Sequence, residues 1–176
     1  MAYETRATPA DLEIRGDGRT VVGIAVPYDS PTQVRAVGGS YTELFRRGAF
    51  ARTIQQATSK VKFLALHDSL SRLPLGRATL LREDTAGLYG EFHVSKTRDG
   101  DEALQLVADG ALDGLSVGFE PVRENVTKAG VVERVEVRLR EVSLVVWPSY
   151  TDALVTAVRG DVVSIAELAA RLERFR

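Results

Sequence analysis

The chain has 176 residues, of which 44% are hydrophobic and 27% charged, and its formal net charge is −1. This balance indicates a soluble globular protein with enough residues for one domain and a sizeable core. Because charges of both signs are interspersed and cysteine is absent, the sequence argues against a nucleic-acid-binding stripe, disulfides, thiolate metal sites and a cysteine nucleophile.

Two further classes are also disfavoured. The two histidines, His67 and His93, are too few for a His-rich metal centre. No stretch approaches the roughly 20 apolar residues of a membrane span, and the first residues lack the apolar region of a secretory signal. We therefore expect no metal, no cofactor and no membrane partner.

The first half of the chain alternates predicted strands with one short helix. Residues 19–29 are rich in β-branched side chains and end at a turn, which predicts a strand. Residues 30–40 hold one Pro and two Gly among polar residues, which predicts a loop. Apolar residues at helical spacing predict a helix over residues 49–57, and residues 60–68 form the next expected strand.

The second half is richer in predicted strands. Residues 76–84 and 87–95 have the pattern of a β-hairpin with a polar turn. Residues 99–112 predict a short helix with acidic residues in its first turn. Residues 114–125 predict a strand, and residues 131–148 a long strand or a bent pair of strands. Several strands with only short helices between them favour a β-rich barrel or sandwich over a doubly wound sheet.

We expect residues 1–158 to form a single domain and residues 159–176 to form a C-terminal helix or tail. The tail is amphipathic, with one apolar face made of Ile165, Leu168, Ala169 and Leu172. A dimer element, a removable segment and a tether are all consistent with this pattern.

Residues 114–118 form a literal G-x-S-x-G around Ser116, the pattern of the nucleophile elbow of α/β-hydrolases. That elbow requires a strand before the serine and a helix after it, whereas here a helix ends near Gly110 and a strand begins near Leu115. The hydrolase triad also runs serine, acid, histidine along the chain, but both histidines precede Ser116. The α/β-hydrolase interpretation therefore fails on context and on order.

A serine nucleophile in another arrangement needs a base, which must be His67 or His93. His93 lies on the strand phase of Tyr89 and Glu91, which predicts a solvent-facing side chain. His67 ends an apolar strand where a loop begins, a place where sheets present functional side chains. The alternative for His67 is a loop histidine paired with Asp68.

The third member of such a site must be an acid, and Glu141 is the candidate. It falls on the same strand phase as the apolar residues Val137 and Leu139. A buried carboxylate is costly unless it is paired, and an imidazole would serve as its partner. Two alternatives stay open, namely a bulge that turns Glu141 outward and a local pair with Arg138 or Arg140.

Five segments, in order along residues 20–153, resemble the phage prohead (head maturation) proteases, serine endopeptidases related in fold to the herpesvirus assemblins. They are GAFARTI (48–54), LALHD followed by LGR (64–68 and 75–77), GLYGEFHV (87–94), DGALDGLSVGF (109–119) and REVSLVVWPSY (140–150). The WPSY stretch departs modestly from this pattern, in which an aromatic residue, Pro and Ala are expected.

The resemblance implies a β-rich α+β fold, a closed or partly closed β-barrel surrounded by short helices. It also implies Ser116 as nucleophile, His67 as base and Glu141 as acid, although the herpesvirus relatives have a histidine as third member. A developing oxyanion needs preorganised donors, and two sources are candidates for the oxyanion or the substrate, the backbone near Val117 and Gly118 and the side chain of Arg77. The alternative for Arg77 is an ordinary surface arginine.

The implied substrate is the scaffold region of the major capsid protein or a separate scaffold, cleaved inside the immature phage head in the host cytoplasm. Self-cleavage and a homodimer are expected by analogy alone. Two other functions stay open: a catalytically inactive capsid assembly or scaffold module of the same fold, and a different serine hydrolase such as an esterase.

Overall fold

The computed structural model describes residues 3–10, 12–16, 18–36 and 39–146. In chain order the elements are β1 (Glu4–Pro9), β2 (Glu13–Arg15), β3 (Thr20–Pro27), β4 (Thr32–Ala36), β5 (Gly39–Phe45), α1 (Ala51–Ala57), the 3₁₀ turn η1 (Thr58–Lys60), β6 (Lys62–Ala65), β7 (Gly76–Glu83), β8 (Gly87–Val94), α2 (Arg98–Ala108), β9 (Gly114–Val126) and β10 (Val132–Val145). No helix among the described residues is long and apolar enough to cross a membrane.

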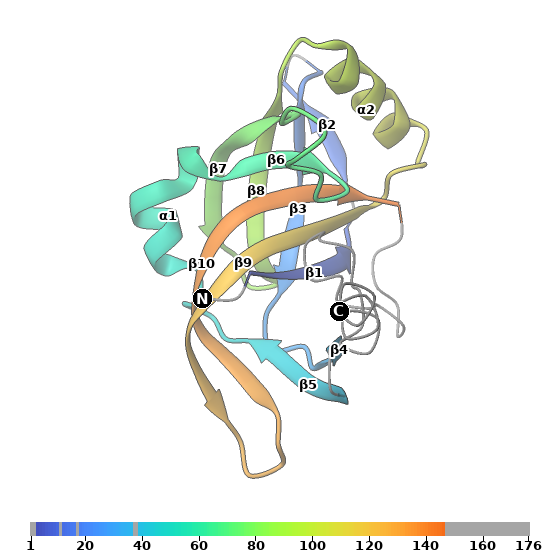
Figure 1. Ribbon diagram of the computed structural model, residues 1–176. Helices are drawn as coiled ribbons and strands as arrows, with labels where there is room; N and C mark the ends of the chain where they lie inside the picture. Colours follow the sequence, from blue (N-terminus) through green and yellow to red (C-terminus); the bar gives the residue numbers. More distant parts are fainter. Residues whose placement is uncertain (1–2, 11, 17, 37–38, 147–176) are drawn as a thin grey trace, which may run out of the picture.

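The ten strands of the described residues form one strongly curled sheet (Figure 1). Its main order is β1-β9-β10-β6-β7-β8-β3-β2, and the β4–β5 hairpin joins through β5 to β10. All pairings are antiparallel except those of β10 with β5 and β6. The curl brings β1 into contact with β3, so the sheet is a partly closed barrel. The predicted β-rich fold with a few short helices is confirmed.

The barrel interior is filled by aliphatic and aromatic side chains from nearly every strand. Phe63 and Phe92 stack with ring centroids 4.7 Å apart, and Phe45 meets Phe119 edge to face at 5.2 Å. From β9, the residues Leu115, Val117 and Phe119 face this core. Because the side chains of a strand alternate between faces, the residues between them point to the opposite face of the sheet.

The loop predicted over residues 30–40 is wrong, because most of it belongs to the antiparallel β4–β5 hairpin. These strands are polar in sequence, and β5 is held in the sheet by its pairing with β10 and by the ion pairs of the buried Glu43 with Arg6 and Arg134. The predicted helix over residues 99–112 is α2, and it begins one residue earlier because the Thr97 side chain accepts a hydrogen bond from the Gly100 N–H. The expected C-terminal helix and the division at residue 158 lie outside the described residues.

Helix α1 covers the part of β10 that lies between its two parallel neighbours. β10 pairs with β5 as far as Arg134 and with β6 from Glu141 onward. Between these points the Val137 N–H donates to the Ala49 carbonyl at 2.9 Å, and the Leu139 N–H donates to Thr53 Oγ1 at 3.2 Å. The N–H groups of Val137 and Leu139, which precede Glu141 on this edge of β10, therefore find their acceptors in and next to α1 and not in another strand.

Replacing Thr53 with Val should destabilise the fold, because it leaves the buried Leu139 N–H without an acceptor. The expected loss in the free energy of unfolding is about 1–3 kcal/mol, measured by urea denaturation. Thr79→Val is the matched control, since the exposed Thr79 hydroxyl also makes a hydrogen bond to the backbone, in this case by donating to the Glu91 carbonyl. The control should change stability by less than about 0.5 kcal/mol. Equal losses in both variants would contradict this account of the α1–β10 contact.

Candidate active site

Ser116 lies on the face of β9 that points away from the barrel core. Its neighbours Leu115 and Val117 are core residues, and its register partner on β10 is Ser143. The next pair along the same face is Gly118 with Glu141. Paired residues share a face of the sheet, so these four positions form one group on the outer face of β9 and β10.

A bulge in β10 brings Glu141 to this outer face. Leu139 pairs with Phe119 and Glu141 pairs with Gly118, so Arg140 is an extra residue in β10. One inserted residue reverses the alternation. The core-facing residues are accordingly Val137 and Leu139 before the bulge and Val142 and Leu144 after it. The expectation that Glu141 shares the apolar face of Val137 and Leu139 is therefore wrong, and the alternative of a bulge is correct.

Glu141 is nevertheless buried, with only 4% of the residue exposed, because other side chains cover it. The neighbouring arginines do not neutralise it, since Arg138 and Arg140 pair with Glu120 at 3.2 and 2.7 Å. The basic side chain that the structure places against the carboxylate of Glu141 is that of His67.

His67 follows β6 in a sharp turn of the backbone. Leu66 and His67 have φ values of +54° and +59°, in the left-handed region that non-glycine residues seldom occupy. The turn is held by the Leu66 N–H, which donates to the Leu144 carbonyl at 2.9 Å, and by the His67 N–H, which donates to Ser143 Oγ at 3.1 Å. Both bonds attach the turn to β10, next to Glu141.

The imidazole of His67 joins Ser116 to Glu141. His67 Nδ1 lies 2.5 Å from Glu141 Oε1, and His67 Nε2 lies 2.6 Å from Ser116 Oγ. In the tautomer that satisfies both contacts, Nδ1–H donates to the carboxylate and Nε2 accepts from the serine hydroxyl. The structure thus brings together the three side chains chosen from the sequence, which we call the Glu141–His67–Ser116 chain. Nε2 is correctly placed to receive a proton from Ser116.

The alternative pairing of His67 with Asp68 does not describe its environment. Asp68 accepts hydrogen bonds from the Ser71 N–H at 2.9 Å and from the Ser71 hydroxyl, within its own loop. Both ring nitrogens of His67 are engaged by Glu141 and Ser116. His93 lies on β8 opposite Thr20 and Arg77, away from Ser116.

Two residues around Glu141 were not anticipated from the sequence. The Tyr3 hydroxyl donates to Glu141 Oε1 at 2.5 Å, and the Ser143 hydroxyl donates to Oε2 at 2.7 Å. Burial, followed by the nearby charge of Glu141, raises the pKa of Tyr3 well above its ordinary value, so the phenol stays protonated and acts as a donor. Ser143 could have been found from its strand phase, but the segment around Tyr3 carries no pattern that would single it out.

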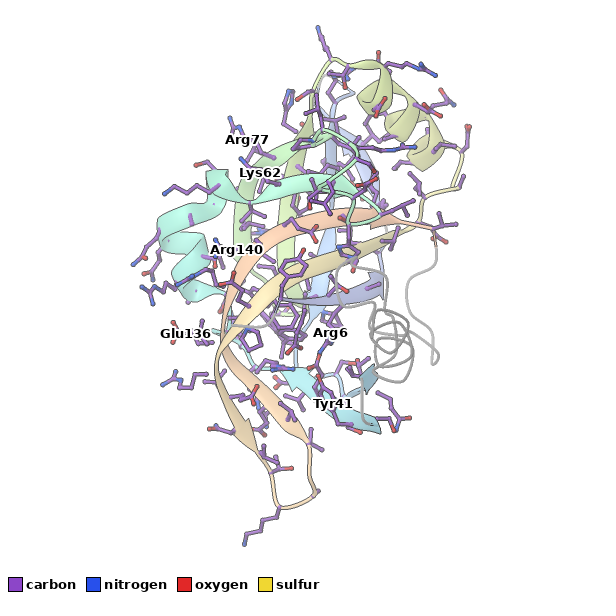
Figure 2. All side chains as sticks on the ribbon, in the orientation of Figure 1. Arg6, Tyr41, Lys62, Arg77, Glu136 and Arg140 are labelled. Carbon is purple, nitrogen blue, oxygen red and sulfur yellow. The ribbon has the colours of Figure 1, made fainter. Side chains whose placement is uncertain are left out.

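The predicted oxyanion or substrate residues lie in three different environments. Arg77 is exposed on β7, and its guanidinium donates to the Ala78 carbonyl at 3.3 Å (Figure 2). The Val117 side chain is in the core. Gly118 lies between Tyr3 and Glu141, where a Cβ would stand 1.8 Å from the phenol oxygen and 2.2 Å from Oε1. The absent side chain makes room for both groups, and the oxyanion role of all three residues stays a prediction.

Among the described residues, no cluster of three or more His, Cys, Asp or Glu side chains could hold a metal ion. The chemistry visible at this site is that of a serine hydroxyl beside an imidazole and a buried carboxylate, the arrangement that generates a serine nucleophile in hydrolases.

The chain is similar to known proteins in sequence and in fold. The family model described as caudovirus prohead serine protease matches residues 5–167. The bacteriophage T4 capsid assembly protease, gp21, is similar in structure with a TM-score of 0.54, 12% sequence identity, and coverage of 81% of this chain and 96% of that one. At this identity the likeness shows a shared fold. No curated protein matches the sequence. Because the family model covers nearly all of the chain, the protein belongs to the caudovirus prohead serine protease family.

Proposed function

We propose that this protein is a serine endopeptidase that cleaves scaffold or capsid-protein segments, and itself, during phage head maturation. The observation that carries the proposal is the unbroken Glu141–His67–Ser116 chain, with contacts of 2.5 and 2.6 Å. Membership of a prohead serine protease family supports a proteolytic role in the phage head.

In the proposed reaction, Ser116 Oγ attacks the scissile carbonyl carbon while His67 Nε2 accepts the hydroxyl proton. The resulting imidazolium is stabilised by the carboxylate of Glu141 and then protonates the leaving amine. The peptide C–N bond breaks and an ester to Ser116 remains. Water hydrolyses this acyl-enzyme in the second half of the reaction, with His67 again as the base.

Ser143 supports this arrangement through two hydrogen bonds. Its hydroxyl accepts from the His67 N–H and donates to Glu141 Oε2, so one buried group fixes the backbone of the base and the side chain of the acid together. Ser143 is completely buried. A positioned imidazole and carboxylate need no rearrangement during proton transfer, which is the physical advantage of such a site.

For the oxyanion we keep the two sources expected from the sequence, the backbone near Val117 and Gly118 and the side chain of Arg77. Arg77 pairs in register with Lys62, which in turn pairs with Glu141, so all three lie on the outer face of the sheet. Figure 2 shows Lys62 and Arg77 close together on β6 and β7. An arginine side chain is long and flexible, so it can turn toward a bound substrate.

The proposal also covers the substrate, the place where the protein acts and its oligomeric state. A capsid protease of this family acts on capsid or scaffold protein, and we place the reaction inside the immature head in the host cytoplasm. A homodimer stays an expectation by analogy. An inactive assembly module and an esterase are the alternatives that the following experiments exclude.

Ser116→Ala should abolish cleavage while leaving the fold intact. Wild type, Ser116→Ala and the exposed control Ser40→Ala are each incubated alone and with a scaffold-bearing capsid protein, and intact masses are followed over time. We expect the same fragments from wild type and Ser40→Ala, and none from Ser116→Ala, because the Ser116 hydroxyl lies within reach of His67 Nε2 whereas Ser40 is exposed on β5. Equal fragmentation by all three proteins would show that Ser116 is not the nucleophile. The incubation is repeated with assembled immature heads. If wild type produces no fragments there either, the chain is a structural relative without proteolytic activity.

The two histidines provide a matched pair for testing the base. A fluorophosphonate probe should label wild-type protein at Ser116, forming an Oγ–P bond as fluoride leaves. His67→Ala should slow this labelling by roughly 10³-fold or more, because the serine loses its general base. His93→Ala should label within about twofold of wild type, since His93 lies on β8 away from Ser116. Equal rates for the two variants would contradict the assignment of His67.

A further inference from the structure

The phenol of Tyr3 approaches the carboxylate oxygen that also accepts from the imidazole. Tyr3 Oη lies 2.5 Å from Glu141 Oε1, and His67 Nδ1 lies 2.5 Å from the same atom. We propose that Tyr3 is a positioning residue of the catalytic site, and that pairing of β1 with β9 completes this site. This inference rests on the proposed function and deepens it.

β1 brings Tyr3 to this place by strand pairing. The register runs from Glu4 opposite Phe119 to Pro9 opposite Gly114, and Tyr3 immediately precedes this stretch. Alternation along the strand places Glu4 and Arg6 toward the barrel interior, whereas Tyr3 lies against the outer face. One strand therefore carries an interior anchor and an exterior contact with the catalytic acid.

The interior anchor is a buried ion cluster at one end of the barrel. The Arg6 guanidinium donates to Glu43, to the Tyr41 hydroxyl at 2.8 Å and to Glu4 at 2.5 Å. Arg134 of β10 joins the same Glu43 at 2.8 Å. Figure 2 shows two members of this cluster, Arg6 and Tyr41, in the lower part of the molecule. Breaking such a pair leaves a buried charge unpaired, so the cluster holds β1 against β5 and β10.

Gly118 is the second observation that supports a specific role for Tyr3. A Cβ at this position would lie 1.8 Å from Tyr3 Oη, 2.5 Å from Tyr3 Cζ and 2.2 Å from Glu141 Oε1. The backbone of Gly118 lies within regular β9 and pairs on both sides, with Thr5 and Glu141. Glycine weakens a strand, and its presence here is explained by the close approach of the phenol and the carboxylate.

Physical chemistry explains why the acid needs this donor. An ionised carboxylate that is 4% exposed is costly unless hydrogen bonds replace its water. Oε2 receives the Ser143 hydroxyl, and Oε1 receives the phenol of Tyr3 in addition to the imidazole. Without the phenol, the carboxylate loses a donor that holds Oε1 in line with His67 Nδ1, and the imidazole is positioned less accurately.

Tyr3→Phe tests this inference because it removes the hydroxyl and keeps the ring. The readout is the second-order rate constant for labelling of Ser116 by the fluorophosphonate probe, which needs no identified substrate. We expect labelling about tenfold slower than wild type, the scale of one hydrogen bond to a charged group. Tyr28→Phe is the matched control, since this half-buried phenol also donates to a glutamate, Glu83, at 3.3 Å. The control should label within about twofold of wild type.

A double-mutant cycle separates positioning from a general loss of structure. If Tyr3 acts through Glu141, Tyr3→Phe should change the rate by less than about twofold in a Glu141→Gln background. A wild-type labelling rate for Tyr3→Phe would overturn the inference, as would an undiminished tenfold effect in the Glu141→Gln background. If wild-type protein is not labelled at all, the proposed function fails and the inference fails with it. The labelling of wild-type protein therefore distinguishes failure of the proposed function from failure of the inference about Tyr3.

Discussion

The buried charge of Glu141 is the constraint on which the rest of the site depends. A carboxylate removed from water must be given hydrogen-bond donors, and the fold supplies three, two of them from distant parts of the chain. They are the phenol of Tyr3 before β1, the imidazole of His67 after β6 and the hydroxyl of Ser143 on β10. The electrostatic requirement of one residue is thus met by groups that the pairing of β1, β6, β9 and β10 brings together.

Two local departures from regular structure make this meeting possible. The bulge at Arg140 turns Glu141 out of the core, and the left-handed backbone at Leu66 and His67 turns the imidazole back over the sheet. Each has an energetic cost. The turn is held by hydrogen bonds to Leu144 and Ser143 of β10, and the bulge follows the Leu139 N–H, which donates to Thr53 of α1. Irregular geometry concentrated beside a serine is what a preorganised active site requires. The regular barrel behind it provides the rigid support.

Much of this could be predicted from the sequence, because periodicity and chain order can be read without a structure. The hairpin of β7 and β8 and the helices α1 and α2 came from local patterns, and the α/β-hydrolase elbow was rejected on local context and on the order of the serine and the histidines. His67 was favoured over His93 by its place at a strand end, and the structure places it beside Ser116.

The remainder depended on contacts that no local pattern reveals. The bulge cannot be seen in a strand that is apolar on both faces, so the phase of Glu141 was misjudged. The polar β4–β5 hairpin is stabilised by β10, more than 80 residues later in the chain, and was taken for a loop. The contact of Tyr3 with Glu141 could be recognised only when the pairing of β1 with β9 was known. The oxyanion role expected of the Gly118 backbone stays a prediction, and the space that this glycine leaves for the acid and the phenol could be seen only in the structure.

The most direct test of the account is the state of the proton between His67 and Glu141. Proton NMR of ¹⁵N-labelled Ser116→Ala protein, in which self-cleavage is prevented, should show an imidazole N–H resonance far downfield of the backbone amides and correlated with His67 Nδ1. We predict that Glu141→Gln moves this resonance upfield or removes it, and that His93→Ala leaves it unchanged. A spectrum without the resonance, or one in which Glu141→Gln does not alter it, would contradict the proposal that a buried carboxylate holds the catalytic base.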